Sequence, residues 1–315
     1  MANPKRKIKK YILRTILVVF IGMNLSAMMH AYHFTHYDSS NGARTLSPEQ
    51  MRWTQKVSAI LFGVSLPRPV NDLQPNLPFQ SFTIDNKLSC WSIRGDSSKP
   101  TILLFHGYGN RKDGMLDRAE ALHEMGYNTV LIDFEGSGAS SGNTCTIGYK
   151  EAEQVKRVYD FMKEKIPEAQ LVLLGRSMGA AAIMRCLTIH SMKPKSIILE
   201  CPFGSLFDAA GNRFDAIGLP RFPLVHMLIF YGGLMNGFWA FDYKPTEYAK
   251  QIKTPSLLLT GGSDDRVTPK ETETIYANLV GDKNYIVYPE AGHESYLIQY
   301  RSEWKNDVDQ FIQTH

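Results

Sequence analysis

Cysteine is scarce in this sequence, and the few cysteines form no cluster. Four of them, at positions 90, 145, 186 and 201, are spread over 315 residues without a Cys-x-x-Cys pair. Zinc sites and disulfide scaffolds need closely spaced cysteines, so neither is indicated. Cys186 and Cys201 lie in apolar surroundings, which predicts small buried hydrophobic side chains. A bridge between Cys90 and Cys145 in an oxidising compartment stays open as an alternative.

The chain also lacks a cationic surface beyond its first residues. Lys and Arg number 35 against 31 Asp and Glu, but six of the basic residues fall within the first fourteen positions, which leaves 29 against 31. Binding to nucleic acid needs a clustered basic face, so the composition argues against it. Internal repeats and low-complexity tracts are absent, and with 43% hydrophobic and 21% charged residues the chain has the composition of a globular protein.

The basic start is followed by one long apolar segment, from Tyr11 to His30. As a helix rising ~1.5 Å per residue, such a segment reaches across the ~30 Å of a hydrocarbon layer. The preceding positive charges predict a cytoplasmic N-terminus, with the rest of the chain beyond the membrane. We therefore predict a membrane anchor in residues 1–35. A cleaved signal peptide, which would give a secreted protein, and an interfacial amphipathic helix stay open, although the possible cleavage points lack a small residue where one is required.

Two further regions follow the anchor. Residues 36–78 are polar and then rich in proline, with Pro67, Pro69, Pro75 and Pro78 after Leu66. Spaced prolines are incompatible with a regular helix or a central strand, so we predict a linker or wrapping arm. The compact domain is expected over residues 79–315.

Within that domain, short apolar runs alternate with amphipathic runs of helix length. Continuous apolarity indicates strands buried on both faces, as in a parallel sheet covered by helices. The order strand, helix, strand predicts an α/β fold with a doubly wound, mostly parallel sheet. Two earlier runs, 81–84 and 88–93, predict a hairpin. The predicted buried strands are 101–106, 129–133, 171–174, 196–200, 256–260 and 285–288, and the helices are 149–165, 177–190 and 270–279.

One segment interrupts this alternation. Residues from about 203 to 245 contain many aromatic side chains among Gly and Pro, and no strand pattern. We predict a helical lid inserted after the sixth strand. Aromatic residues fill both lids and ordinary helical core, so a core layer remains the alternative.

Ser177 lies in the sequence Gly175-Arg-Ser-Met-Gly179, between a predicted strand and a predicted helix. A Gly-x-Ser-x-Gly motif in that position is typical of a sharp turn that exposes a nucleophilic serine. The flanking glycines remove side chains that such a turn would crowd. We predict Ser177 to be the nucleophile.

Acyl transfer by serine also needs donors for the developing oxyanion. The backbone N–H of Met178, at the start of the helix, is one candidate. The second is the N–H of Tyr108, in the loop His106-Gly-Tyr-Gly that ends an earlier strand. His106 itself is expected to shape this loop rather than to act as the base.

The general base must be a histidine held by a carboxylate. The segments 260–269 and 288–295 each follow a predicted strand, and they contain Asp264, Asp265 and His293. The order Ser177, acid, His293 is the order of α/β-hydrolases. We predict Asp265 as the acid because it begins Asp-Arg-Val-x-Pro, with Asp264 as the alternative.

These motifs together resemble the α/β-hydrolase superfamily, and most closely its membrane-anchored α/β-hydrolase-domain and BEM46-like members, related to serine aminopeptidases. The resemblance implies an α/β-hydrolase fold and a serine hydrolase without metal or organic cofactor. The motifs that carry it are His106-Gly-Tyr-Gly, Asp133-Phe-Glu-Gly-Ser-Gly, Gly175-Arg-Ser-Met-Gly, Gly262-Ser-Asp-Asp-Arg-Val and Gly292-His293.

The predicted activity is hydrolysis of a carboxylic ester or a related acyl bond through a Ser-His-Asp triad and an acyl-enzyme. The expected substrate is a small or lipid-like acyl compound, and the expected second partner is the membrane. A peptidase or amidase using the same triad is one alternative. An anchored, non-catalytic binding module is another.

Overall fold

The computed structural model describes residues 4–38 and 52–315. Most of the predicted polar stretch at 36–50 therefore lies outside the described residues. Within the predicted linker, residues Trp53–Phe62 form a helix, α2, and the extended chain after it leads into the first strand at Phe79.

A sheet of eight strands forms the centre of the domain, in the order β1-β2-β4-β3-β5-β6-β7-β8. Strands β3 to β8 run parallel, and β2 pairs antiparallel with both β1 and β4. The predicted doubly wound fold and the hairpin are confirmed. The strands are β1 Phe79–Ile84, β2 Leu88–Ile93, β3 Thr101–Phe105, β4 Asn128–Ile132, β5 Leu171–Arg176, β6 Ser196–Glu200, β7 Ser256–Gly261 and β8 Lys283–Tyr288.

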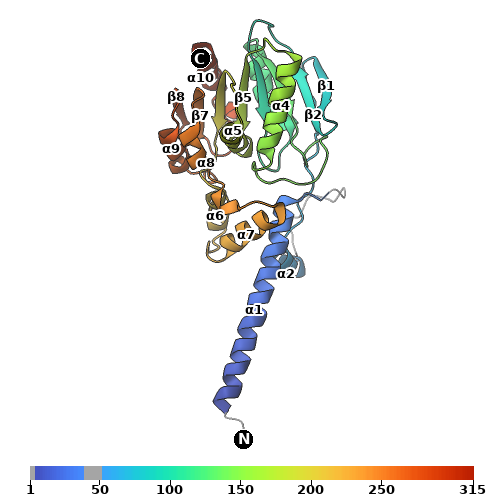
Figure 1. Cartoon of the computed structure of the whole chain (residues 1–315), viewed down its shortest axis with the longest axis vertical. Helices are drawn as coiled ribbons and strands as arrows, with labels where there is room; N and C mark the ends of the chain where they lie inside the picture. Colours follow the sequence, from blue (N-terminus) through green and yellow to red (C-terminus); the bar gives the residue numbers. More distant parts are fainter. Residues whose placement is uncertain (1–3, 39–51) are drawn as a thin grey trace.

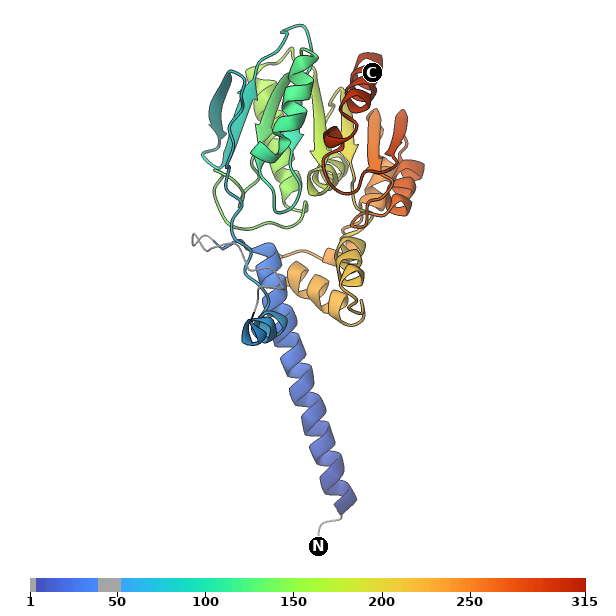
Figure 2. The same ribbon diagram turned by 180° about the vertical axis from the view of Figure 1, so that it is seen from behind.

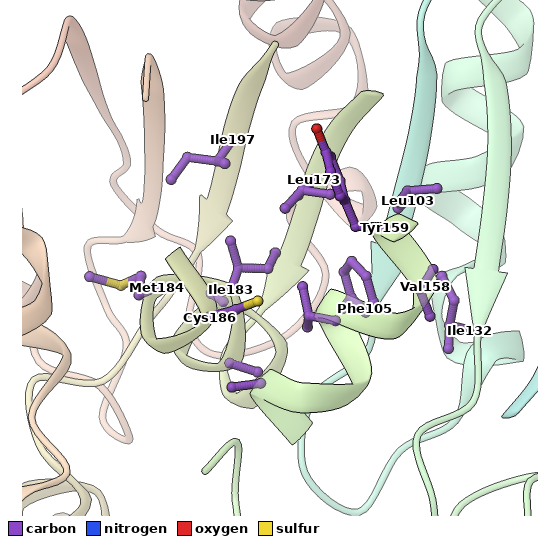
Figure 3. Close-up of a cluster of buried hydrophobic side chains, with 14 of the residues drawn as sticks. Leu103, Phe105, Ile132, Val158, Tyr159, Leu173, Ile183, Met184, Cys186 and Ile197 are labelled. Atoms are coloured by element: carbon purple, nitrogen blue, oxygen red, sulfur yellow. The ribbon is translucent and has the colours of Figure 1, made fainter. Parts of the chain in front are cut away.

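Alternate residues of each central strand bury against helices on opposite faces of the sheet. In β3, Leu103 and Phe105 belong to one apolar cluster, which Figure 3 shows in close-up. Ile102 and Leu104 belong to the other. The first cluster is covered by α4 (Glu151–Lys165), α5 (Met178–Ile189), α8 (Pro245–Tyr248) and α9 (Pro269–Asn278), and the second by α3 (Leu116–Glu124) and α10 (Arg301–Thr314). Single-turn 3₁₀ helices occupy Lys112–Met115, Ala240–Asp242, Ala249–Gln251 and Tyr296–Ile298.

The aromatic segment forms two helices, α6 (Leu206–Ala216) and α7 (Leu224–Asn236). They build an apolar cluster of their own, distinct from the two that cover the sheet, and this cluster rests on Ala181 of α5 and on Val267. Figures 1 and 2 show α6 and α7 between the sheet and the projecting part of α1. The segment is thus a helical insertion between β6 and β7, and its role as a lid stays a prediction.

Helix α1 (Pro4–Thr35) projects from the domain (Figure 1). Its part Ile8–Thr35 is, among the described residues, the one helix long and apolar enough to cross a membrane. Apolar side chains along it are exposed, for example Leu13 at 67% and Val18 at 69%. A helix with this surface is unstable in water unless a lipid or protein partner covers it.

A buried ion pair joins the end of β6 to α3. Arg118 and Glu200 are both at most 1% exposed, and Nη2 of the arginine lies 2.7 Å from Oε2 of the glutamate. The other carboxylate oxygen of Glu200 accepts a hydrogen bond from Trp304 Nε1 at 2.9 Å. These contacts fix the residue that immediately precedes Cys201 at the edge of the sheet.

Replacing Glu200 by glutamine should destabilise the fold strongly. The change leaves the buried charge of Arg118 without its main partner, a loss of about 3–5 kcal/mol in the free energy of unfolding. Glu124→Gln, at an exposed contact with Arg301, should cost less than about 1 kcal/mol. Urea unfolding of the two variants compares them directly, and equal losses would contradict the account.

Candidate active site

Ser177 lies on a strained turn between β5 and α5. Its backbone has φ 51° and ψ −109°, in a region that residues other than glycine rarely adopt. Its N–H donates a hydrogen bond to the carbonyl of Glu200 at 2.7 Å. Neither flanking glycine tolerates a side chain: a Cβ at Gly175 would lie 2.5 Å from the nitrogen of Ala180, and one at Gly179 would lie 2.2 Å from the carbonyl oxygen of Phe105. The sequence can thus hold Ser177 at the tip of this turn.

The loop after β3 lies against this turn. A Cβ on Gly107 would be 3.7 Å from Cβ of Ser177. The next residue is Tyr108, and Met178 is the first residue of α5, where a backbone N–H has no partner within the helix. The two predicted oxyanion donors therefore belong to segments that border Ser177.

His106 shapes the loop, as predicted. Its Nδ1 pairs with the carbonyl of Gly107 at 2.8 Å, and its Nε2 accepts the N–H of Phe134 at 3.1 Å. Burial lowers its pKa, so the ring is held neutral. With both ring nitrogens engaged, His106 is not available as a base.

His293, in the loop after β8, pairs with the carboxylate of Asp264. The distance between Nδ1 and Oδ2 is 2.7 Å, and the Asp264 side chain is fully buried. This corrects the prediction for Asp265, which is exposed. The other oxygen of Asp264 accepts the backbone N–H groups of Arg266 and Val267, both at 2.9 Å, so the turn after β7 holds this carboxylate toward the histidine.

Two glycines let the loop after β7 approach the histidine loop closely. A Cβ on Gly261 would lie 2.3 Å from the carbonyl oxygen of Ala291, and one on Gly262 would lie 2.5 Å from that of Pro289. The N–H of Ser263 donates a hydrogen bond to the carbonyl oxygen of Ala291 at 2.9 Å, between the same two loops. The segment Gly-Gly-Ser-Asp thus brings Asp264 and His293 together.

Cys201 lies next to both the histidine and the serine turn. Arg176 pairs with Glu200 in the β5–β6 register, so Ser177 and Cys201 leave the sheet side by side. Ligand atoms of Cys201, Asp264 and His293 lie within 4.8 Å of one another. Arg176 also donates from Nη2 to the carbonyl of His293. Serine turn, thiol, imidazole and carboxylate therefore gather at the carboxyl edge of the sheet, where α/β sheets place their sites.

The pKa of His293 is raised to about 9. Burial is the largest influence and lowers it, but the adjacent Cys201 sulfur and the hydrogen bond and charge of Asp264 together outweigh burial. A histidine in this setting gains its proton readily, which favours the imidazolium form.

If His293 acts as a general base, activity should rise with pH up to about 9. Because only the neutral imidazole accepts a proton, kcat/KM should fall about tenfold for each pH unit below that value. Steady-state kinetics on a short-chain ester, measured as a function of pH, would show this rising limb of the kcat/KM profile. Cys201→Ala removes one of the groups that raise the pKa and should move the limb toward lower pH. A limb at the ordinary histidine value of 6.5 would show that Cys201 and Asp264 do not raise the pKa of His293.

Sequence reasoning missed two neighbours of the histidine. Cys201 was expected only as a buried hydrophobic residue, and it is buried and free, as are Cys90, Cys145 and Cys186; the alternative of a Cys90–Cys145 bridge is not formed. Its position directly after a strand, at the same edge as Ser177 and His293, was the available signal. The contact from Arg176 had no signal in the sequence.

Comparisons with known proteins bear on the fold that carries this site. A family model described as serine aminopeptidase, S33 (Hydrolase_4) matches residues 96–220. An esterase of Pyrococcus furiosus, Pf2001, superposes with a TM-score of 0.65 at 26% identity, covering 79% of this chain and 96% of that one. The chain has the α/β-hydrolase fold.

Curated relatives match a larger part of this chain than the family model does. The α/β-hydrolase domain-containing protein WAV2 of Arabidopsis thaliana is 24% identical over 81% of this chain and 85% of its own. YqkD of Bacillus subtilis is 25% identical over 67% of this chain and 70% of its own. Lysophosphatidylserine lipase ABHD12 of Danio rerio is 29% identical, but over only 55% of this chain and 45% of its own. The predicted resemblance to this superfamily is confirmed.

Proposed function

We propose that this α/β-hydrolase is a serine hydrolase that cleaves a carboxylic ester or a related acyl bond. Ser177 is the nucleophile, His293 the general base and acid, and Asp264 the carboxylate that orients the histidine. The observation that carries the proposal is the 2.7 Å contact between His293 and Asp264, at the sheet edge that also carries Ser177 on its strained turn.

The reaction follows from these positions. His293 takes the proton of the Ser177 hydroxyl as its oxygen attacks the acyl carbon, and the carbonyl oxygen becomes an oxyanion that the N–H groups of Tyr108 and Met178 stabilise. The bond to the leaving group breaks as the imidazolium returns the proton to it. Water, deprotonated by the same histidine, then hydrolyses the acyl-enzyme. Asp264 stabilises the imidazolium and fixes its tautomer.

The N-terminal helix supports a membrane location for this activity. Its apolar stretch is long enough to cross a bilayer, and basic residues precede it. We propose that it is a retained anchor, with the catalytic domain on the extracytoplasmic side. The alternative is export followed by cleavage.

An acyl ester is favoured over a peptide, although the matching family model is described as a serine aminopeptidase. The esterase and the lysophosphatidylserine lipase among the similar proteins, together with the apolar lid, support a lipid-like acyl substrate. The purified full-length chain should hydrolyse p-nitrophenyl acyl esters with a higher kcat/KM than aminoacyl p-nitroanilides. The reverse order would indicate a peptidase, and failure to hydrolyse either would favour a binding module.

A further inference from the structure

Three side chains of the candidate active site carry donor atoms that zinc prefers. Cys201 offers a sulfur, His293 an imidazole nitrogen and Asp264 a carboxylate oxygen, and these atoms all lie within 4.8 Å of one another. Ligands of these kinds bind Zn²⁺ at about 2.0–2.3 Å in a tetrahedral arrangement. Ligand atoms in such a site stand roughly 3.5 Å apart, so shifts of about 1 Å close the cluster around an ion.

The topology of the sheet explains why these ligands meet. Strands β6, β7 and β8 are parallel neighbours. Cys201 directly follows β6, Asp264 lies in the turn after β7, and His293 lies in the loop after β8. Each strand therefore brings one ligand to the same edge of the sheet. The spacing of the cysteines gave no sign of this cluster, because its ligands come from three separate segments of the chain.

Surrounding hydrogen bonds orient two of the ligands, as outer groups commonly do at metal sites. Oδ1 of Asp264 accepts the backbone N–H groups of Arg266 and Val267. Its Oδ2, which contacts Nδ1 of His293, is the oxygen that can bind an ion. Arg176 donates to the carbonyl of His293 and so holds the histidine loop. The side chain of His293 is 11% exposed, so an ion can reach the cluster from solvent at the imidazole.

Tyr296 supplies an unpartnered donor beside the thiol. The residue is only 1% exposed, and its hydroxyl has no nitrogen or oxygen partner among the residues that the structure describes. Burial raises the pKa of this hydroxyl, and the neighbouring Cys201 raises it further. A cysteine bound to a metal is a thiolate, which accepts hydrogen bonds better than the neutral thiol. The hydroxyl of Tyr296 therefore gains a partner when an ion binds Cys201.

We propose that Cys201, Asp264 and His293 form a zinc site that inhibits the hydrolase by occupying its base. The effect on activity rests on the proposed function, because it requires His293 to be the general base. The ion displaces the thiol proton and one imidazolium proton to solvent. The ring then carries zinc on one nitrogen and its remaining proton on the other, so it has no lone pair left to accept the proton of Ser177. Hydrolysis stops while the ion is bound.

Zinc should inhibit ester hydrolysis reversibly. In the full-length chain in detergent micelles, about 0.1 mM Zn²⁺ should lower kcat/KM for p-nitrophenyl butyrate at least about tenfold, and EDTA should restore it. Mg²⁺ at the same concentration should have no effect, because it prefers oxygen ligands alone. An enzyme that keeps its full activity in Zn²⁺ would overturn the inference.

Cys201→Ala removes the sulfur ligand and should raise the Zn²⁺ concentration for half-inhibition at least about tenfold. The comparison is made within each variant, with and without the ion, so that a change in basal activity does not enter. Cys186→Ala is the matched control, because Cys186 is also buried and free but lies on α5, outside the cluster. It should be inhibited like the wild type. Equal sensitivity of the Cys201→Ala variant would overturn the inference.

Binding of Co²⁺ separates this inference from the proposed function. Cobalt accepts the same tetrahedral ligands as zinc and reports a bond to thiolate by a charge-transfer band in the ultraviolet. The Ser177→Ala chain should show this band, and adding Cys201→Ala should remove it. If the band appears in this way but the wild-type chain hydrolyses no ester, the proposed function fails and the metal site stands. If esters are hydrolysed and the band is absent, the metal site fails alone.

Discussion

Ser177→Ala should abolish ester hydrolysis, with kcat reduced by at least about 10⁴-fold and by as much as about 10⁶-fold. The alanine keeps the strained turn and the donors of the oxyanion loop but has no oxygen to attack the acyl carbon. Stopped or discontinuous assays with p-nitrophenyl butyrate would measure the loss.

The control for this prediction is Ser196→Ala. Ser196 lies at the start of the neighbouring strand and is fully buried, so the change removes a hydroxyl of the same kind from the other end of the sheet. Its kcat should stay within about threefold of wild type. Full activity in Ser177→Ala, with the protein folded, would show that the reaction uses another nucleophile.

Asp264→Asn should lower kcat by about 10⁴-fold. The amide occupies the same space but favours the wrong tautomer of His293 and no longer stabilises the imidazolium. Asp265→Asn is the matched control one residue away, with an exposed side chain, and it should change kcat by less than about threefold.

The same pair of variants decides between the two assignments of the acid. If Asp265→Asn is the inactive variant and Asp264→Asn is not, the hydrogen bond between Asp264 and His293 has no catalytic role. Circular dichroism on both variants checks that the difference is not one of folding.

The core of the fold could be predicted because its strands are buried on both faces and therefore continuously apolar. The runs 88–93 and 196–200 are strands with the same bounds in the structure, and the other predicted strands differ only at their ends. Helices α3 and α10 were not predicted. Most residues of these two helices are polar or charged. A few buried residues, such as Leu122 and Trp304, pack them against the sheet.

The site could be predicted in part. The strand before Ser177, the helix after it and the chain order of the acid and the histidine are all local features of the sequence. The choice between Asp264 and Asp265 is not local, because it depends on which side chain the turn after β7 directs inward. That direction is set by the two N–H groups bonded to Asp264, which a motif does not reveal.

The contact between anchor, lid and oxyanion loop could not be predicted either. The hydroxyl of Tyr108 donates to the carbonyl of Phe34 at 2.7 Å, yet the two residues are far apart in the chain, and neither belongs to a pattern that pairs them. The sequence indicates a membrane helix and an aromatic insertion separately. Only the three-dimensional structure shows that α1, α6, α7 and Tyr108 line one apolar cavity.

The central claim is that Ser177 is activated by His293 and Asp264, and reaction with a fluorophosphonate tests it most directly. Mass spectrometry of peptides from the labelled full-length chain should find the adduct on Ser177. The labelling rate should be unchanged in Asp265→Asn and at least about 100-fold lower in Asp264→Asn and His293→Ala. Absence of the adduct from Ser177 in the folded chain, or labelling at the wild-type rate without His293, would contradict the account.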